Sequence, residues 1–171
     1  QIVAHDMAEI RGAFQRLYSD GVLSENALDN VRRYGLHPLM ERPDGAHDGW
    51  AIPVFDAEKQ RGWRGPYVAQ EGRRDIDAAP DAFGQPAGTD EVPVIEDPFS
   101  ASDTDGHYYR VVAPENTSGD YVYREMLLVC VGPNGDLDIT LPTLTIGDSL
   151  DLESVAAGTD DTVIRLCPYV E

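Results

Sequence analysis

The fold is decided by the first stretch of the chain, which reads QIVAHDMAEIRGAFQRLY over residues 1–18. Five apolar residues in it are separated by four, three, four and three positions: Val3, Met7, Ile10, Phe14 and Leu17. That spacing places them on one face of an α-helix. Asp20-Gly21 then ends the pattern, since Gly commonly follows a helix. We therefore predict an amphipathic helix over residues 1–19. Its apolar face is in register from the first residue, so we expect it to be the end of a longer helix.

The next part of the chain is predicted to be a short helix followed by an irregular region. Ser24 is a suitable N-cap, Leu28 and Val31 are apolar helix positions, and Gly35 is a stop signal. From residue 45 to residue 98, Gly and Pro recur and apolar runs are short. We expect residues 20–100 to hold this second helix and a long irregular segment.

The last third of the chain has the pattern of β-strands. Residues 107–112 and 121–131 are predicted to form an antiparallel hairpin, because only a short polar loop separates them. Residues 141–146 are a weaker strand candidate, and residues 162–166 are the last. Helices first and strands later indicate an α+β fold, with the N-terminal helix packed on an antiparallel sheet within residues 101–171. We expect residues 1–171 to form a single globular domain.

The charge of the chain limits what it can bind. The 171 residues include 13 Lys and Arg against 31 Asp and Glu, for a formal net charge of −18. Affinity for nucleic acid depends on cations that neutralise phosphates, so we expect no nucleic-acid partner.

The two cysteines leave two alternatives open. Cys130 lies in a predicted strand, and Cys167 ends the apolar run at residues 163–167 that overlaps the last one. If those strands are neighbours, a disulfide fits the geometry and implies an oxidising compartment. Otherwise the two residues are separate buried thiols.

The chain lacks the residue patterns of common catalytic sites. It has neither a Gly-x-Ser-x-Gly nucleophile elbow nor a phosphate-binding glycine loop. Its four histidines are His5, His37, His47 and His107, and their spacing is not that of metal ligands. Asp44, His47 and Asp48 gather on one loop but form no recognisable catalytic set. We predict that the protein is not an enzyme.

An acidic turn follows the strongest predicted strand. Asn134, Asp136 and Asp138 alternate there like the first three ligand positions of an EF-hand. Ile139 and Thr145 stand where that motif requires Gly and Glu, so the turn is not an EF-hand.

A second acidic pair, Asp160-Asp161, precedes the last predicted strand. Because calcium accepts irregular loops and six to eight oxygen ligands, the two acidic groups could form a calcium site if they converge. The alternative is a turn rich in Asp and Asn that holds no ion.

Several short blocks, in order, resemble the major pseudopilins of type II secretion and their type IV pilin relatives. The most specific is RGWRGPYV at residues 61–68, which is close to the Trp-Arg-Gly-Pro-Tyr block of that family. GLHPLMERP at 35–43, DPF at 97–99, VGPNGD at 131–136 and DDTVI at 160–164 resemble further blocks.

The resemblance implies a filament subunit. Such proteins carry an apolar N-terminal helix, trimmed and methylated by a dedicated peptidase, which anchors them in the inner membrane and packs in the filament core. The globular part lies in the periplasm, and the partners are other copies and related subunits. The family also binds calcium in the loop before its last strand, which here implies the ligands Asn134, Asp136, Asp138, Asp160 and Asp161.

One alternative function stays open at this stage. The chain could be a soluble periplasmic binding module that calcium stabilises and that has no role in a filament. We would then expect an aromatic pocket lined by Trp50, Phe55, Trp63 and Tyr67.

Overall fold

The computed structural model describes residues 2–21, 24–45, 50–69, 72–75, 91–99 and 108–166. Its first element is the helix α1 (Ile2–Ser19), which confirms the helix predicted at the N-terminus. Met7, Phe14 and Leu17 are fully buried and Ile10 nearly so, whereas Val3 is partly buried. The periodic apolar face therefore faces the core, as its spacing predicts.

Helix α2 (Glu25–Tyr34) begins and ends where the sequence indicates. The Oγ of Ser24 accepts a hydrogen bond from the backbone N–H of Ala27 at 3.3 Å, which is the expected N-cap. Gly35 ends the helix with a φ of +65°, a conformation that disfavours residues with a side chain. A four-residue helix that the sequence did not predict, α3 (His37–Met40), follows directly.

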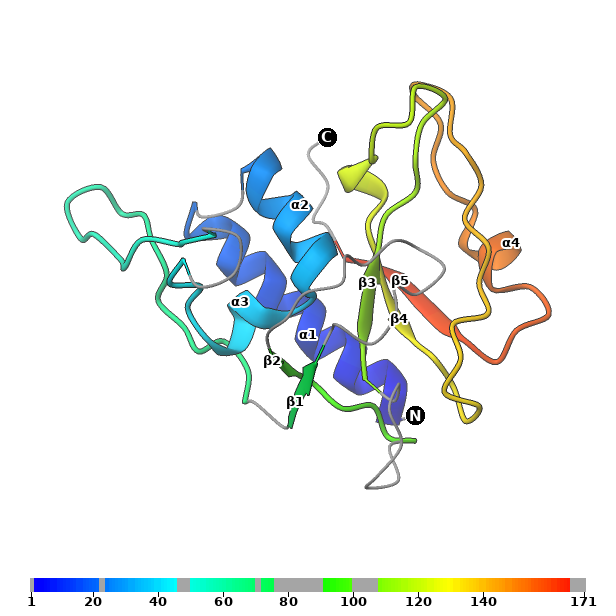
Figure 1. The fold of residues 1–171 in the computed structure, drawn as a ribbon, viewed down its shortest axis with the longest axis horizontal. Helices are drawn as coiled ribbons and strands as arrows, with labels where there is room; N and C mark the ends of the chain where they lie inside the picture. Colours follow the sequence, from blue (N-terminus) through cyan, green and yellow to red (C-terminus); the bar gives the residue numbers. More distant parts are fainter. Residues whose placement is uncertain are drawn as a thin grey trace.

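Three strands form the main sheet: β3 (Arg110–Val112), β4 (Leu127–Cys130) and β5 (Thr162–Arg165). They are antiparallel in the order β3-β4-β5, and Leu128 of β4 pairs with Val111 of β3 and Ile164 of β5. Figure 1 shows α1 lying beside this sheet. The predicted α+β fold with an N-terminal helix and a C-terminal antiparallel sheet is thus confirmed.

The strand predicted over residues 121–131 is shorter in the structure. A 3₁₀ turn, η1 (Tyr123–Glu125), precedes β4. Glu125, within this turn, is only 1% exposed and accepts hydrogen bonds from the Nε of Arg165 at 2.9 Å and the backbone N–H of Leu150 at 3.1 Å. The turn thus places a buried carboxylate where both donors reach it.

The segment at residues 141–146 is also not a strand. Leu144 forms one isolated bridge with Asn116, and its N–H donates to the carbonyl of Glu115 at 2.9 Å. His107, the first residue of another predicted strand, lies outside the described residues, and β3 begins at Arg110.

The middle of the chain contains a two-stranded ribbon that the sequence did not predict. β1 (Gly72–Asp75) and β2 (Glu91–Val94) are antiparallel, with Gly72 opposite Val94. The chain then joins the main sheet region, since the N–H of Tyr109 donates to the carbonyl of Ile95 at 3.0 Å.

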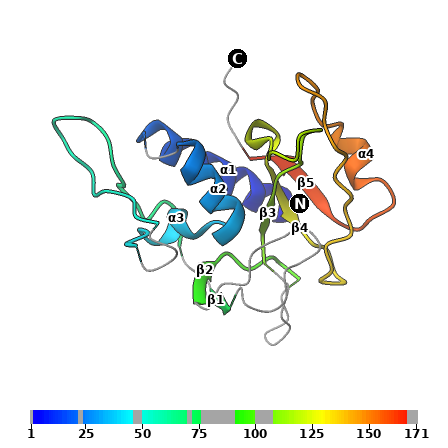
Figure 2. The same ribbon diagram turned by 45° about the horizontal axis from the view of Figure 1, so that its top comes forward.

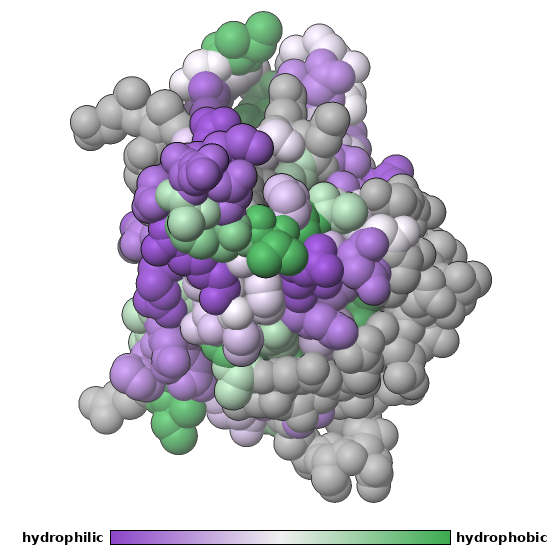
Figure 3. Space-filling view, turned by 90° about the vertical axis from the view of Figure 1, so that its left-hand side faces the viewer, coloured by the Kyte–Doolittle hydropathy of each residue, from purple (hydrophilic) through white to green (hydrophobic). Residues whose placement is uncertain are grey.

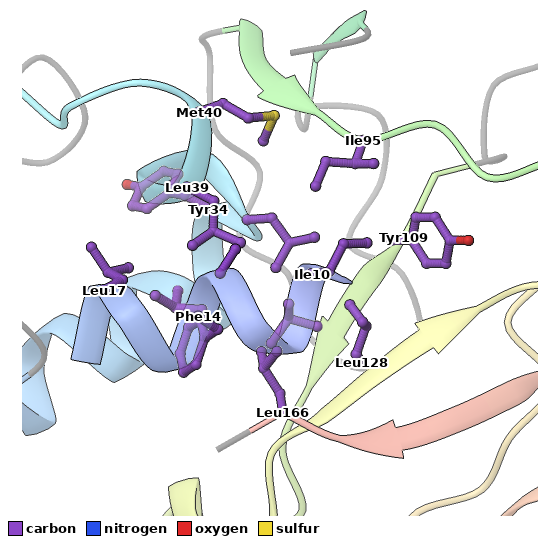
Figure 4. Close-up of a cluster of buried hydrophobic side chains, with 14 of the residues drawn as sticks. Ile10, Phe14, Leu17, Tyr34, Leu39, Met40, Ile95, Tyr109, Leu128 and Leu166 are labelled. Atoms are coloured by element: carbon purple, nitrogen blue, oxygen red, sulfur yellow. The ribbon is translucent and has the colours of Figure 1, made fainter. Parts of the chain in front are cut away.

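The core lies on both faces of β4, all four residues of which are buried. Leu128 and Cys130 belong to the cluster around α1, whereas Leu127 and Val129 belong to a second cluster with Ile139 and residues from the following loops. Figures 1 and 2 both show α4 (Leu152–Ala156) and its flanking loops on the side of the sheet away from α1. Figure 4 shows the first cluster, with Phe14 and Ile10 of α1 near Leu128 and Leu166.

Figure 3 shows one face of the molecule, on which hydrophilic residues predominate among those that are coloured. Smaller hydrophobic areas lie near the centre, at the top and at the lower left of this view. Among the described residues, no helix combines the length and apolar character that a membrane span requires.

Replacing Phe14 with Ala should lower the free energy of unfolding by about 3–5 kcal/mol, because the ring is fully buried and a cavity would remain. The measurement is equilibrium denaturation in urea. Tyr18→Ala is the matched control, since this aromatic side chain on the same helix is 39% exposed and should change the value by less than about 1 kcal/mol. Equal effects of the two changes would contradict the placement of α1.

Candidate metal site between the turn after β4 and the start of β5

The acidic turn is built from local hydrogen bonds. The chain leaves β4 through Gly132 and turns again at Gly135, both with positive φ. The Oδ1 of Asn134 accepts from the backbone N–H of Asp136 at 2.9 Å, which is an Asx turn. The Nδ2 of Asn134 donates to the Oδ2 of Asp138 at 2.6 Å. These bonds hold Asn134 and Asp138 together, while the Asp136 side chain is exposed.

The second acidic pair reaches this turn from the far end of the long loop. The Oδ2 of Asp161 accepts from the backbone N–H groups of Asp138 at 2.8 Å and Ile139 at 3.0 Å. Thr159 helps to set this geometry, because its Oγ1 donates to the carbonyl of Ala156 and accepts from the N–H of Asp161. Asp161 is therefore fastened to the backbone of the acidic turn, which brings the two acidic segments next to each other.

Asp161 is the most unusual residue of the group. It is 6% exposed, and its second oxygen, Oδ1, is buried without a hydrogen-bond partner. Burial raises the pKa of its carboxyl group, and the nearby carboxylates of Asp138 and Asp160 raise it further, although its two backbone hydrogen bonds oppose them. A cation would stabilise such a carboxylate, which is buried, has one oxygen without a hydrogen-bond partner and lies near two other acidic side chains.

The chemistry of these donors fits calcium, which takes carboxylate, amide and backbone oxygens. The buried Asp161 and the exposed Asn134, Asp136, Asp138 and Asp160 would supply them. The carboxylates do not yet converge on one point: among residues that the structure describes, no three His, Cys, Asp or Glu side chains are grouped as a metal ion requires. Asn134 and Asp138, joined by their own hydrogen bond, would have to turn toward an ion.

Two residues of this site were missed by sequence reasoning, Gly132 and Thr159. A Gly directly after a strand is a signal for a left-handed turn, but it does not show what packs against it. The role of Thr159 depends on a turn at the end of α4 that residue types alone did not indicate.

Only one of the two cysteines lies in the part of the chain that the structure describes. Cys130 is a free thiol, 1% exposed, and its Sγ lies 3.7 Å from the Oδ2 of Asp97. Burial raises its pKa to about 11, so the thiol stays protonated at neutral pH. Cys167 lies outside the described residues, and both alternatives, a disulfide with Cys130 or two separate thiols, stay predictions.

The histidines are scattered. His5 is exposed on α1, and His37 is buried against Trp50, with ring centroids 5.9 Å apart. His47, Asp48 and His107 lie outside the described residues.

The four aromatic residues proposed for a pocket each make a separate contact. Trp50 is buried and stacked on Tyr34, and the guanidinium of Arg64 lies over the ring of Phe55. Trp63 and Tyr67 meet edge to face, with ring centroids 6.2 Å apart. These contacts are those of anchors that hold the loop against the helices.

The Trp-Arg-Gly-Pro-Tyr block is explained by such anchoring. The Nε1 of Trp63 donates to the carbonyl of Pro38 at 2.7 Å, and the Tyr67 hydroxyl donates to the Oδ2 of Asp20 at 2.5 Å. A Cβ on Gly65 would lie 2.6 Å from the Trp63 ring and 2.8 Å from the Tyr67 ring. Only Gly fits between the two aromatic side chains, which explains the order of residues in the block.

A second block of the resemblance, at residues 97–99, forms a local turn. In Asp97-Pro98-Phe99, the Oδ1 of Asp97 accepts from the backbone N–H of Phe99 at 2.9 Å. Asp97 is 3% exposed, so the block places a buried Asx turn beside the Cys130 thiol.

Replacing Asp161 with Ala should lower the free energy of unfolding by about 1–3 kcal/mol in the presence of a chelator, because the backbone N–H groups of Asp138 and Ile139 lose their acceptor. Urea denaturation measures the change. Asp136→Ala is the control, since that side chain is exposed on the same turn and should have an effect near zero. An Asp161→Ala chain as stable as the wild type would mean that this carboxylate does not hold the loop.

Comparison with protein-family models, with curated proteins and with solved structures gave no match for this chain.

Proposed function

We propose that this chain is the globular part of a structural subunit of a pilus-like or pseudopilus filament, of the type II secretion or type IV pilin kind. It performs no chemistry of its own. The subunit assembles with other copies and with related subunits through an apolar helix that precedes residue 1, and that helix anchors it in the inner membrane with the globular part in the periplasm. An assembly of this kind uses contacts that repeat from one subunit to the next without closing.

The observation that carries the proposal is the order of the resembling blocks along an α+β chain whose first element is the amphipathic helix α1. The Trp-Arg-Gly-Pro-Tyr block is fastened to Pro38 of α3 and to Asp20, which directly follows α1. The acidic turn and the acidic pair meet at the start of β5. Specific hydrogen bonds hold each of these blocks in place, as expected of structural rather than catalytic residues.

Assembly of the full-length protein tests the proposal. Protein extracted from its own membranes should form filaments visible by electron microscopy, whereas residues 1–171 alone should sediment as a monomer or associate only weakly. Full-length protein that remains monomeric under all conditions in which it is folded would contradict a filament role.

The alternative function, a soluble calcium-stabilised binding module, is favoured by one observation. A groove of about 670 Å³ runs between α2 and residues 50–62, and Trp50, Ile52 and Val54 contribute to its lining. The same sedimentation and microscopy experiments separate the two functions, because a binding module has no reason to assemble.

Calcium is part of both functions. Within the filament proposal, Asp161, Asp160 and Asp138 would hold the ion, with Asn134 as a further oxygen donor and Asp136 at the exposed edge. The ion would supply positive charge to a group of neighbouring carboxylates, and it would fix the long loop between β4 and β5.

Calcium at 100 times its dissociation constant should raise the free energy of unfolding by about 2.7 kcal/mol, because the ion binds the folded chain in preference to the unfolded one. Differential scanning calorimetry with calcium and with chelator measures the change. Magnesium should give a smaller effect, since it demands a tighter octahedral geometry. An unchanged melting temperature under chelation would remove the metal site.

A further inference from the structure

Gly132 makes an unusually close approach to Asp160. It stands directly after Val131 at the end of β4, with a φ of +69°. A Cβ added to it would lie 2.7 Å from the carbonyl oxygen of Asp160 and 2.8 Å from both the Cγ and the Oδ2 of that residue. A side chain at position 132 would therefore displace both the backbone and the carboxylate of Asp160.

Other glycines with positive φ do not have this contact. Gly119, Gly147 and Gly158 have φ values of +85°, +97° and +80°, and nothing lies within 4 Å of a Cβ placed on any of them. These three glycines have a positive φ, as Gly132 does, but no residue lies as close to them as Asp160 lies to Gly132. A Cβ on Gly62 would also meet close backbone neighbours, the nearest being the carbonyl oxygen of Val54, but only Gly132 among these glycines lies against a residue of the acidic pair.

The contact brings Asp160 against the turn where the other acidic residues gather. The adjacent residue, Asp161, binds the backbone of Asp138 and Ile139 through Oδ2 and has a buried Oδ1 without a partner. Pressing a further carboxylate toward this oxygen is unfavourable unless a cation lies between them. Backbone carbonyl oxygens, such as that of Asp160, are also suitable ligands for calcium.

We propose that Gly132 is a positioning residue of the calcium site: by lacking a side chain, it lets the Asp160 carboxylate close against the turn beside Asp161. This inference rests on the calcium binding proposed above. Gly132 touches no ion itself, and it acts by leaving room for Asp160.

The test compares Gly132→Ala with Gly158→Ala, which introduces the same strain of a side chain at positive φ without a contact. Calcium chloride is titrated into each purified chain by calorimetry. Gly132→Ala should weaken calcium binding about 10–100-fold, as loss of a supporting residue around a metal typically does. Gly158→Ala should bind like the wild type.

A spectroscopic readout distinguishes a role at the metal from a general loss of stability. Terbium replaces calcium, and its luminescence lifetimes in H₂O and D₂O report how many water molecules remain bound to the ion. Gly132→Ala should show more bound water than the wild type and Gly158→Ala the same amount, because only the first change displaces a ligand.

Asp160→Ala keeps the inference testable if Gly132→Ala does not fold. This change removes the carboxylate without altering position 132, and it should weaken calcium binding and add bound water to terbium. Wild-type affinity in Asp160→Ala, or in a folded Gly132→Ala chain, would overturn the role of Gly132 while leaving calcium binding intact. Failure of the wild-type chain to bind calcium would overturn the proposed calcium site and, with it, the role of Gly132.

Discussion

Burial of one face of α1 against the sheet is the interaction on which the rest of the structure depends. Phe14, Met7 and Leu17 of this helix are fully buried, in the same cluster as Leu128 of β4 and Leu166 after β5. A three-stranded sheet with strands of three or four residues has little independent stability. The helix supplies the apolar surface that such a sheet needs on one face.

The other face of the sheet is covered by a loop, and two buried carboxylates fasten it. Glu125 accepts the N–H of Leu150 and pairs with Arg165 of β5. Asp161 accepts the N–H groups of Asp138 and Ile139. Both acids therefore replace the ladder hydrogen bonds that an irregular segment lacks, and they let Ile139 and Leu150 pack beneath it.

The elements with strong periodicity could be predicted from the sequence. The stripe of α1, the Ser24 cap of α2 and the apolar runs of β4 and β5 each encode their own structure through local spacing. The β1–β2 ribbon could not be predicted, because both strands are only four residues long, β1 is polar in sequence and β2 contains a Pro. The strand predicted over residues 121–131 is too long, because its first half contains the turn η1. The buried Glu125 in that turn pairs with Arg165, which lies 40 residues later and could not be identified from local sequence.

The candidate site, like the fold, could be predicted from the sequence only in part. The acidic residues were visible in the sequence because alternating Asp and Asn in a turn are characteristic of oxygen donors. Their meeting required the tertiary contact of Asp161 with residues 138 and 139, and the part played by Gly132 required knowledge of the space around Asp160. Residue types thus indicated oxygen donors, whereas the fold decided which of these donors lie near one another.

The central claim is that α1 is the end of a filament-forming helix, and the mature N-terminus of the protein from its own cells tests it most directly. Mass spectrometry of the intact protein and of its N-terminal peptide is the measurement. The account predicts a methylated first residue followed by about 20 apolar residues that lead into α1. A free, unmethylated N-terminus close to Gln1 would contradict it.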